Sequence, residues 1–453
     1  MKREKGRVKI IIYLVLALLL ELVLAVIVIR GITNNTIEVN GAMFVIVILL
    51  LLIPIMLIAL LFVLIYGKKE PKFIVPTGLS GKRTSENDDP SKDGKERFCM
   101  LGKIEEQRNS YGHLKYNKNI SLEKLCEDFR NYAASRKKLY YDIDDIRRFI
   151  AGMAVSKILI LQGVSGTGKT SMAHAFGSFM DNTSTVIPVQ PMWKERTDLL
   201  GYYNEFTKRF NETVLLEKMY EANYSKDIYI TVLDEMNIAR VEYYFAEFLS
   251  LLELPNPEDR YIEVVSDVWE NDPPQFKDGR IKLPENMWFI GTANNDDSTF
   301  AISDKVYDRA MILNLDKKSE RFAAPMTDKT YISAEQFMEL VEEAKSEYEI
   351  SKRNRSRLEE LDKFLIEHFH ITFGNRIMKQ ILTYIPVYIS CGGDELVALD
   401  DIIAKKVIRK LETQNPIYLR NTSEELISFI DDLFGAENMT LCKEYIHRLQ
   451  RNA

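Results

Sequence analysis

The stretch that decides the fold is Lys157–Ser171, K-I-L-I-L-Q-G-V-S-G-T-G-K-T-S. Its first half is an apolar run that predicts a buried strand, and its second half predicts a glycine-rich turn that opens a helix. The residues from Gly163 to Thr170 fit the pattern G-x-x-x-x-G-K-[ST]. Glycines let successive backbone N–H groups converge on an anion, and a helix N-terminus adds partial positive charge. The stretch therefore predicts a phosphate-binding loop.

The loop also predicts which residues hold a nucleotide. Lys169 can reach the β- and γ-phosphates, and the hydroxyl of Thr170 can ligate Mg²⁺. The alternative is a surface loop rich in small residues that happens to contain a lysine, and the apolar strand before it weighs against that. The predicted nucleotide-binding residues are Gly163, Val164, Ser165, Gly166, Thr167, Gly168, Lys169, Thr170, Ser171 and Asp234.

A second apolar run, Asp227–Glu235 (D-I-Y-I-T-V-L-D-E), ends in two adjacent carboxylates. We expect Asp234 to bind Mg²⁺ with Thr170, and Glu235 to polarise the attacking water. Adjacent acids at a strand end could instead cap a helix. Their position about 65 residues after the phosphate loop favours a nucleotide site, because parallel sheets bind ligands at the carboxyl ends of their strands.

The chain has 453 residues, a net charge of −6 and 46% hydrophobic residues, which is enough for several domains. Between residues 119 and 329 apolar runs alternate with helical patterns, which predicts a three-layer α/β sandwich around a parallel sheet of five strands. From residue 330 to residue 453 the patterns are helical and predict a lid with a C-terminal extension. The five predicted strands are Ile158–Leu161, Thr185–Gln190, Ile228–Leu233, Asn286–Thr292 and Ala310–Leu315.

Two long apolar segments, residues 10–29 and 42–66, predict a transmembrane hairpin before this core. At ~1.5 Å per residue each is long enough to cross a hydrocarbon layer of ~30 Å. Lysines and arginines precede the first segment, within residues 1–9, and lysines follow the second. Both termini and the nucleotide site are therefore expected on the cytoplasmic side. A cleaved signal peptide is the alternative for the first segment, which is longer than such peptides and is followed directly by a second span.

Residues 67–118 are rich in Gly, Ser, Pro, Lys and acids, and we expect a flexible cytoplasmic linker. The mixed charges of this linker and the acidic balance of the whole chain argue against direct nucleic-acid binding. The four cysteines are scattered without a C-x-x-C pair, which suits reduced thiols in the cytosol.

The chained motifs resemble AAA+ NTPases, and specifically their McrB-like and MoxR-like branches, the dynein-related group. The resemblance covers about residues 120–410 and is specific because several motifs occur in order. Its segments are L-D-E-M-N-I-A-R from Leu233, the insert-like Trp193–Phe210, the run Trp288–Leu315 and the tetrapeptide Phe373–Arg376.

The resemblance implies four catalytic residues. Glu235 would be the base, and Asn294 would be the sensor 1 residue that orients the lytic water. Arg309 would be the arginine finger that acts on the nucleotide of the neighbouring subunit, and Arg376 would be a sensor 2 residue that contacts the γ-phosphate of its own chain. The alternatives are a turn asparagine at 294 and a surface ion pair of Arg309 with Asp304 or Asp308.

The base preference stays open. McrB-type GTPases carry M-N-x-x-D at sensor 1, and here Ala293 replaces the methionine while Asn294 and Asp297 remain. We expect ATP as the substrate, with GTP as the alternative. Between the acids and sensor 1, the arms Tyr261–Val265 and Gly279–Leu283 predict a hairpin that either faces the centre of a ring or covers the sheet edge.

The expected function is that of a membrane-anchored NTPase in a ring, of six subunits by the resemblance, with nucleotide sites between subunits. No protease or nuclease signature is present in the sequence, so its output would lie in a partner effector protein, as in restriction or anti-phage defence. A MoxR-like chaperone that remodels a protein and a membrane scaffold that is switched by nucleotide are the alternatives.

Overall fold

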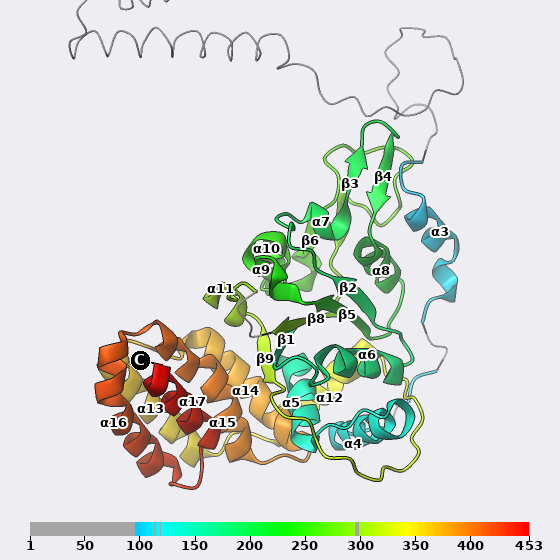
Figure 1. Ribbon diagram of the computed structural model, residues 1–453. Helices are drawn as coiled ribbons and strands as arrows, with labels where there is room; N and C mark the ends of the chain where they lie inside the picture. The colour runs from blue at the N-terminus through cyan, green and yellow to red at the C-terminus, as the bar shows by residue number, and fades with distance from the viewer. Residues whose placement is uncertain (1–95, 113–114, 118, 295–298, 453) are drawn as a thin grey trace, which may run out of the picture. The chain divides into compact units, whose positions relative to one another are not determined.

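The computed structural model describes residues 96–112, 115–117, 119–294 and 299–452. Its centre is a five-stranded sheet in the order β2-β5-β8-β1-β9, and all neighbouring strands run parallel (Figure 1). The predicted number of strands and their parallel direction are confirmed. The strands are β1 (Ile158–Gly163), β2 (Thr185–Pro188), β5 (Tyr229–Asp234), β8 (Met287–Asn294) and β9 (Met311–Asn314).

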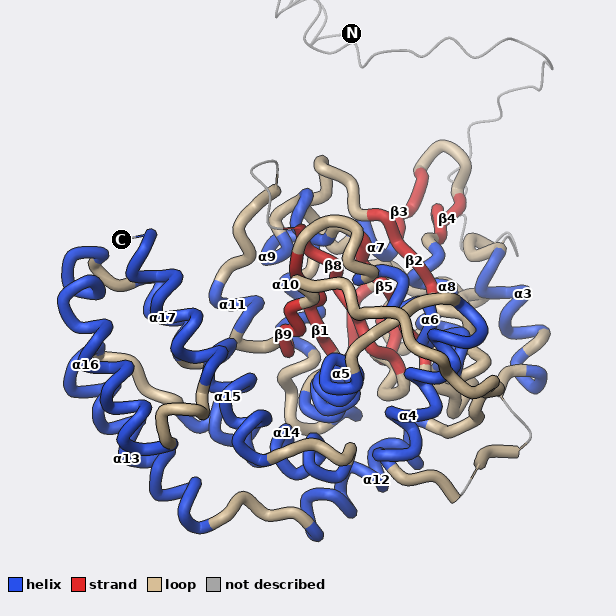
Figure 2. The backbone as a smooth tube through the Cα atoms, turned by 60° about the horizontal axis from the view of Figure 1, so that its bottom comes forward, coloured by secondary structure: helices blue, strands red, loops and turns tan. Residues whose placement is uncertain are grey.

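The sheet is buried on both faces because its apolar residues alternate between two hydrophobic clusters. In β1, Leu159 and Leu161 join the first cluster, and Ile158 and Ile160 join the second. A strand whose two faces are both covered reads as a continuous apolar run, as β1 does. Helices α4 (Leu122–Tyr132), α5 (Ile143–Val155) and α6 (Lys169–Phe179) supply the first cluster, and α8 (Val214–Ala222), α9 (Val241–Tyr244) and α10 (Ala246–Leu251) supply the second. The result is a three-layer sandwich (Figure 2).

The helices after residue 333 form the lid. They are α12 (Ala334–Glu347), α13 (Lys352–Phe369), α14 (Gly374–Ser390), α15 (Glu395–Lys406), α16 (Pro416–Phe434) and α17 (Thr440–Asn452), with a 3-10 helix at Ile408–Thr413. Helix α14 packs on core helix α5. Buried polar groups join the two: Arg148 of α5 pairs with Asp401 of α15 at 3.1 Å, and Tyr384 of α14 donates to Asp401 at 2.7 Å. The lid is therefore fixed to the core through α14 and α15.

Two antiparallel hairpins are added to the core. One is β3 (Gly201–Asn204) with β4 (Arg209–Glu212), which projects from the body (Figure 1) and carries Phe206, 95% exposed, in its turn. The other is β6 (Tyr261–Glu263) with β7 (Arg280–Lys282), which lies where hairpin arms were predicted.

The predicted flexible linker is wrong for its last part, because the chain is already folded from residue 96. Phe98 and Leu101 are buried, and helix α3 (Met100–Glu106) packs on α8. Arg97 forms two hydrogen bonds to the carboxylate of Asp272, and its guanidinium lies 4.6 Å from the ring centre of Trp269. These partners lie about 170 residues away in the chain, so local composition could not reveal them.

Glu212 of β4 holds the start of α3. Its carboxylate accepts hydrogen bonds from the backbone N–H groups of Cys99, Met100 and Leu101 at 2.8 to 3.0 Å. These are donors that the first turn of a helix cannot satisfy internally.

Within the ranges that the structure describes, no helix is both long enough and apolar enough to cross a membrane. The predicted transmembrane hairpin, residues 10–29 and 42–66, lies outside those ranges.

Candidate nucleotide site

Three strand ends bring the predicted site residues to one edge of the sheet. Strands β1, β5 and β8 end at Gly163, Asp234 and Asn294, and Gly163 is directly opposite Asn294 in the register of β1 with β8. Because β8 lies between β1 and β5, the phosphate loop and the acidic pair flank it at its carboxyl end. This edge is where open parallel sheets bind their ligands.

The loop after β1 needs glycine at two positions for a steric reason. Gly163 has φ 139° and Gly168 has φ 94°, both in the region that side chains disfavour. A Cβ on Gly163 would come within 2.3 Å of the carbonyl oxygen of Leu315. Helix α6 begins at Lys169, immediately after Gly168, so its first N–H groups lie in the loop.

Lys169 is nearly buried inside this loop. Its side chain is 6% exposed, and Nζ donates to the carbonyl oxygens of Gly163 and Val164 at 2.9 Å each. Burial lowers the pKa of Lys169, and the carboxylates of Asp316 and Asp234 oppose that shift. The ammonium is therefore held inside the loop by two of its backbone carbonyl groups.

The phosphate loop and the acidic strand are in direct contact. Thr170 Oγ1 donates to Asp234 Oδ1 at 2.7 Å, and Thr292 Oγ1 donates to the same oxygen at 2.9 Å. The Thr292 hydroxyl also accepts a hydrogen bond from the backbone N–H of Glu235 at 2.9 Å. Sequence reasoning missed Thr292, although a threonine two residues before Asn294 in a strand must share its face of the sheet.

Removing the Thr292 hydroxyl tests this arrangement. Thr292→Val keeps the shape but leaves Asp234 and the Glu235 backbone each one hydrogen bond short, which costs about 1–3 kcal/mol. We expect turnover to fall by about 10- to 100-fold, with little change in nucleotide affinity, in a steady-state phosphate-release assay. Thr231→Val, in the middle of β5, is the matched control and should keep its turnover. Equal rates for the two variants would contradict the assigned role.

The turn that carries Glu235 is unusual. Glu235 has φ 52° and ψ 46°, a left-handed conformation that costs about 1 kcal/mol or more for a non-glycine residue. Its side chain is exposed, and the chain continues into a 3-10 helix at Met236–Ile238. Asn237 fixes this turn to the end of β8 by donating to the carbonyl oxygens of Asn294 at 3.0 Å and of Phe300 at 3.3 Å. Glu235 and Asn294 are therefore positioned by one shared residue, Asn237, which was not predicted.

A cavity of about 620 Å³ lies beside Asn294 and is lined by both core and lid. Asp316 of the core and Arg409 and Arg448 of the lid are among its lining residues. Arg448 is exposed and belongs to α17, a helix for which the sequence predicted no site residue. The lid thus presents arginines to the carboxyl edge, but from the 3-10 helix Ile408–Thr413 and from α17, whereas the sequence predicted Arg376.

The two predicted catalytic arginines lie at the opposite, amino edge of the sheet. Arg309 lies two residues before the start of β9, and its carbonyl oxygen accepts a hydrogen bond from Ser156, just before β1, at 2.8 Å. Glu253, after α10, pairs with Arg309 at 2.7 Å and with Arg376, at the start of α14, at 2.6 Å. A single carboxylate therefore holds both guanidinium groups side by side.

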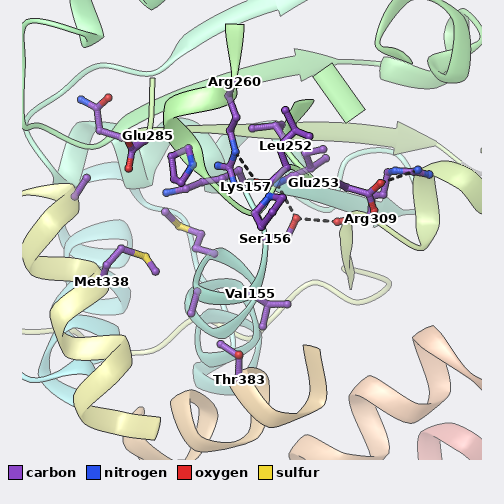
Figure 3. Close-up of a pocket in the computed structure, with 18 of the residues that line it drawn as sticks. Val155, Ser156, Lys157, Leu252, Glu253, Arg260, Glu285, Arg309, Met338 and Thr383 are labelled. Carbon is purple, nitrogen blue, oxygen red and sulfur yellow. Dashed lines mark hydrogen bonds and ion pairs between the residues drawn. The ribbon is translucent and has the colours of Figure 1, made fainter. Parts of the chain in front are cut away.

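These groups line a cavity of about 1510 Å³. Figure 3 shows Glu253 and Arg309 beside Ser156 on one side of it, with Met338 of α12 and Thr383 of α14 lining it lower in the view.

The structure therefore divides the predicted site in two. It brings the loop with Lys169 and Thr170 together with the acidic pair and Asn294. The sequence predicted that Arg376 reaches the nucleotide of its own chain, and the structure does not place it there. Helix α14 packs on α5 with its first residues toward the amino edge of the sheet. The partner of Arg309 is Glu253, and neither Asp304 nor Asp308 pairs with it in the described structure.

The residues at the carboxyl edge fit a magnesium ion. The Thr170 hydroxyl and the Asp234 carboxylate place two oxygen donors side by side, and Mg²⁺ prefers oxygen and takes few protein ligands when phosphates and water supply the others.

The parallel sheet, the glycine loop that opens α6 and the adjacent acid strand define a P-loop nucleotide-binding protein. Consistent with this class, residues 158–310 match the AAA domain (dynein-related subfamily). Residues 158–310 are thus similar to a domain of nucleotide-hydrolysing proteins, which supports nucleotide hydrolysis in general. Residues 324–453, which include the lid, match a domain of unknown function (DUF8727).

Solved structures that resemble the chain include a candidate ATPase from Cytophaga hutchinsonii, with 15% sequence identity and a TM-score of 0.44 over 73% of this chain and 97% of that one. No curated protein matches the chain.

Proposed function

We propose that this protein is a membrane-anchored ATPase that works as a ring of its own copies and drives a partner protein. The observation that carries the proposal is the contact of Thr170 with Asp234 beside the buried Lys169. This arrangement unites the phosphate-binding and metal-binding groups of one nucleotide site.

In the proposed reaction, water attacks the γ-phosphate of ATP in line with the leaving group. Lys169 and the loop N–H groups bind the phosphates, Glu235 takes the proton of the water, and Asn294 orients that water. Thr170 and Asp234 would hold Mg²⁺, which when bound would offset the negative charge of the phosphates. Glu235 suits its role because its side chain is exposed at the end of β5 while its backbone is fixed by Thr292.

The division of the site between two edges of the sheet supports a ring. Arg309 and Arg376 lie at the amino edge, away from the phosphate loop of their own chain. A head-to-tail contact would place the amino edge of one copy against the carboxyl edge of the next, and such contacts form rings when the rotation closes. Six copies are the expected number from the resemblance.

The membrane anchor is proposed from two apolar segments of the sequence, and the partner from exposed aromatic residues on the surface. The apolar segments 10–29 and 42–66 would form the anchor, with the folded part on the cytoplasmic side. A protein partner is favoured over nucleic acid because the projecting β3–β4 hairpin exposes Phe206 and Tyr202 and the chain is acidic. An effector in anti-phage defence and a substrate of a chaperone both remain within this proposal.

The test is nucleotide hydrolysis by the full-length chain purified in detergent. We expect phosphate release from Mg-ATP, slower release from Mg-GTP, and oligomers when a slowly hydrolysed ATP analogue is present. Release no faster than from a Lys169→Ala variant would overturn the proposed activity. Faster phosphate release from GTP than from ATP would show that GTP is the substrate and leave the rest of the proposal unchanged. A chain that stays monomeric with the analogue would contradict the proposed ring.

A further inference from the structure

The segment that carries Arg309 is held by the lid of the same chain. This Arg309 segment comprises α11 (Asp304–Tyr307) and the turn Asp308–Ala310 before β9. Lys406, the last residue of α15, donates from Nζ to the carbonyl oxygen of Tyr307 at 2.7 Å and also to that of Ala310. Gln380 of α14 donates to the carbonyl oxygen of Asp308 at 3.1 Å. Three backbone carbonyl groups of the Arg309 segment are thus bonded to lid side chains.

Lid side chains also contact the side chains of the segment. Arg409 pairs with Asp304 at 2.8 Å, and its guanidinium lies 4.1 Å from the ring centre of Tyr307. Arg376 shares Glu253 with Arg309. A displacement of the lid would therefore move or release the Arg309 segment, because lid groups contact both its backbone and its side chains.

We call these contacts between the lid and the Arg309 segment the joint, and Lys406 is its central group. It is 2% exposed, and burial lowers its pKa to about 7, with Asp308 opposing the shift and the cations Arg409, Lys410 and Arg376 adding to it. A neutral amine still has two hydrogens, so both carbonyl bonds persist on either side of that pKa. Burying an amine is costly unless its hydrogen bonds are made, so its position between two carbonyls is well determined.

Several buried polar atoms of the joint make no hydrogen bond in the described part of the single chain. Within the described residues, five buried polar atoms at this place have no hydrogen-bond partner: Ser303 Oγ, Asp308 Oδ1, Arg309 Nε, Gln380 Oε1 and Arg409 Nε. Each such atom destabilises this arrangement, because it has lost its contact with water and gained no partner in exchange. A second arrangement of the joint that gave these atoms partners would gain hydrogen bonds.

We propose that the lid of each subunit sets the position of its own Arg309, with Lys406 as the positioning residue, and thereby reports its state to the nucleotide site of the next subunit. This inference rests on the proposed function, since it requires Arg309 to act on a neighbour. It adds a direction of communication: from the lid of one chain, through the Arg309 segment, to the phosphate loop of the following chain.

The test is Lys406→Met, which keeps the length of the side chain and removes both donors. We expect turnover to fall by about 10- to 100-fold, while the affinity for ATP stays within about twofold, because the phosphate loop of the variant is intact. Lys363→Met changes an exposed lysine of α13 and is the matched control, with unchanged turnover.

Mixing experiments separate positioning from a general structural defect. Lys406→Met mixed with Lys169→Ala should regain turnover, because the second chain supplies a working Arg309 to the phosphate loop of the first. Lys406→Met mixed with Arg309→Ala should regain none, since both chains lack a working Arg309. The reference mixture is Arg309→Ala with Lys169→Ala. If this reference regains turnover and neither Lys406→Met mixture does, the inference is overturned. The proposed function would still stand in that case.

If Lys406→Met does not fold, as judged by its thermal unfolding, Gln380→Leu carries the same two mixtures. Gln380 makes a single bond to the segment, and its loss leaves Lys406 in place. Failure of the reference mixture itself would instead remove the proposed action of Arg309 between subunits.

Discussion

The Glu235→Gln variant is expected to bind ATP as well as the unchanged chain does and to lose turnover by a factor of about 10²–10⁴. An amide has nearly the shape of the carboxylate, so the left-handed turn and the bond from its N–H to Thr292 remain. It cannot accept the proton of the attacking water, so only the chemical step is affected. Binding is checked by titration with a fluorescent ATP analogue, and turnover by phosphate release.

The control for this variant is Glu437→Gln, an exposed carboxylate of the lid loop before α17, which should change neither quantity. Undiminished phosphate release from Glu235→Gln would refute the assignment of the base. A large loss of ATP affinity would show instead that the carboxylate serves binding.

The second large effect is expected for Arg309→Ala. An arginine finger contributes about 10³–10⁵ to the rate of phosphoryl transfer, so turnover should nearly vanish. Because Arg309 lies at the amino edge and the phosphate loop at the carboxyl edge, the loss should be relieved in mixed oligomers with Lys169→Ala. Each chain then supplies the group that the other lacks, and phosphate release by the mixture should exceed the sum of the two separate rates.

A mixture of Lys169→Ala with Glu235→Gln is the internal control for mixing. Both defects belong to the carboxyl edge, so every site in that mixture is disabled and no recovery is expected. Arg376→Ala mixed with Lys169→Ala asks the same question of the lid arginine. Recovery of turnover in this mixture would agree with the place of Arg376 beside Arg309. If Arg376→Ala loses turnover and the mixture does not restore it, Arg376 acts on the nucleotide of its own chain.

The sheet and the carboxyl edge of the site were predictable because the signals for them are local. An apolar run followed by G-x-x-x-x-G-K-T, or by two acids, specifies both a strand and the loop at its carboxyl end, all within about ten residues. Arg376 marks the limit of such signals: the sequence places it at the start of a helix, but only the packing of α14 on α5 decides which edge of the sheet it reaches. Asn237 and Thr292 were missed because their roles depend on contacts between strands that are far apart in the chain.

The docking of Arg97 and α3 has a mechanical consequence. Any pull transmitted along the chain from its first 95 residues enters the folded body through the bonds of Arg97 to Asp272 and of Glu212 to the start of α3. That load is applied at the β3–β4 hairpin and the neighbouring loop of β6–β7, and not at the sheet. The two hairpins are thus the first parts of the body to be strained when the chain ahead of them is pulled.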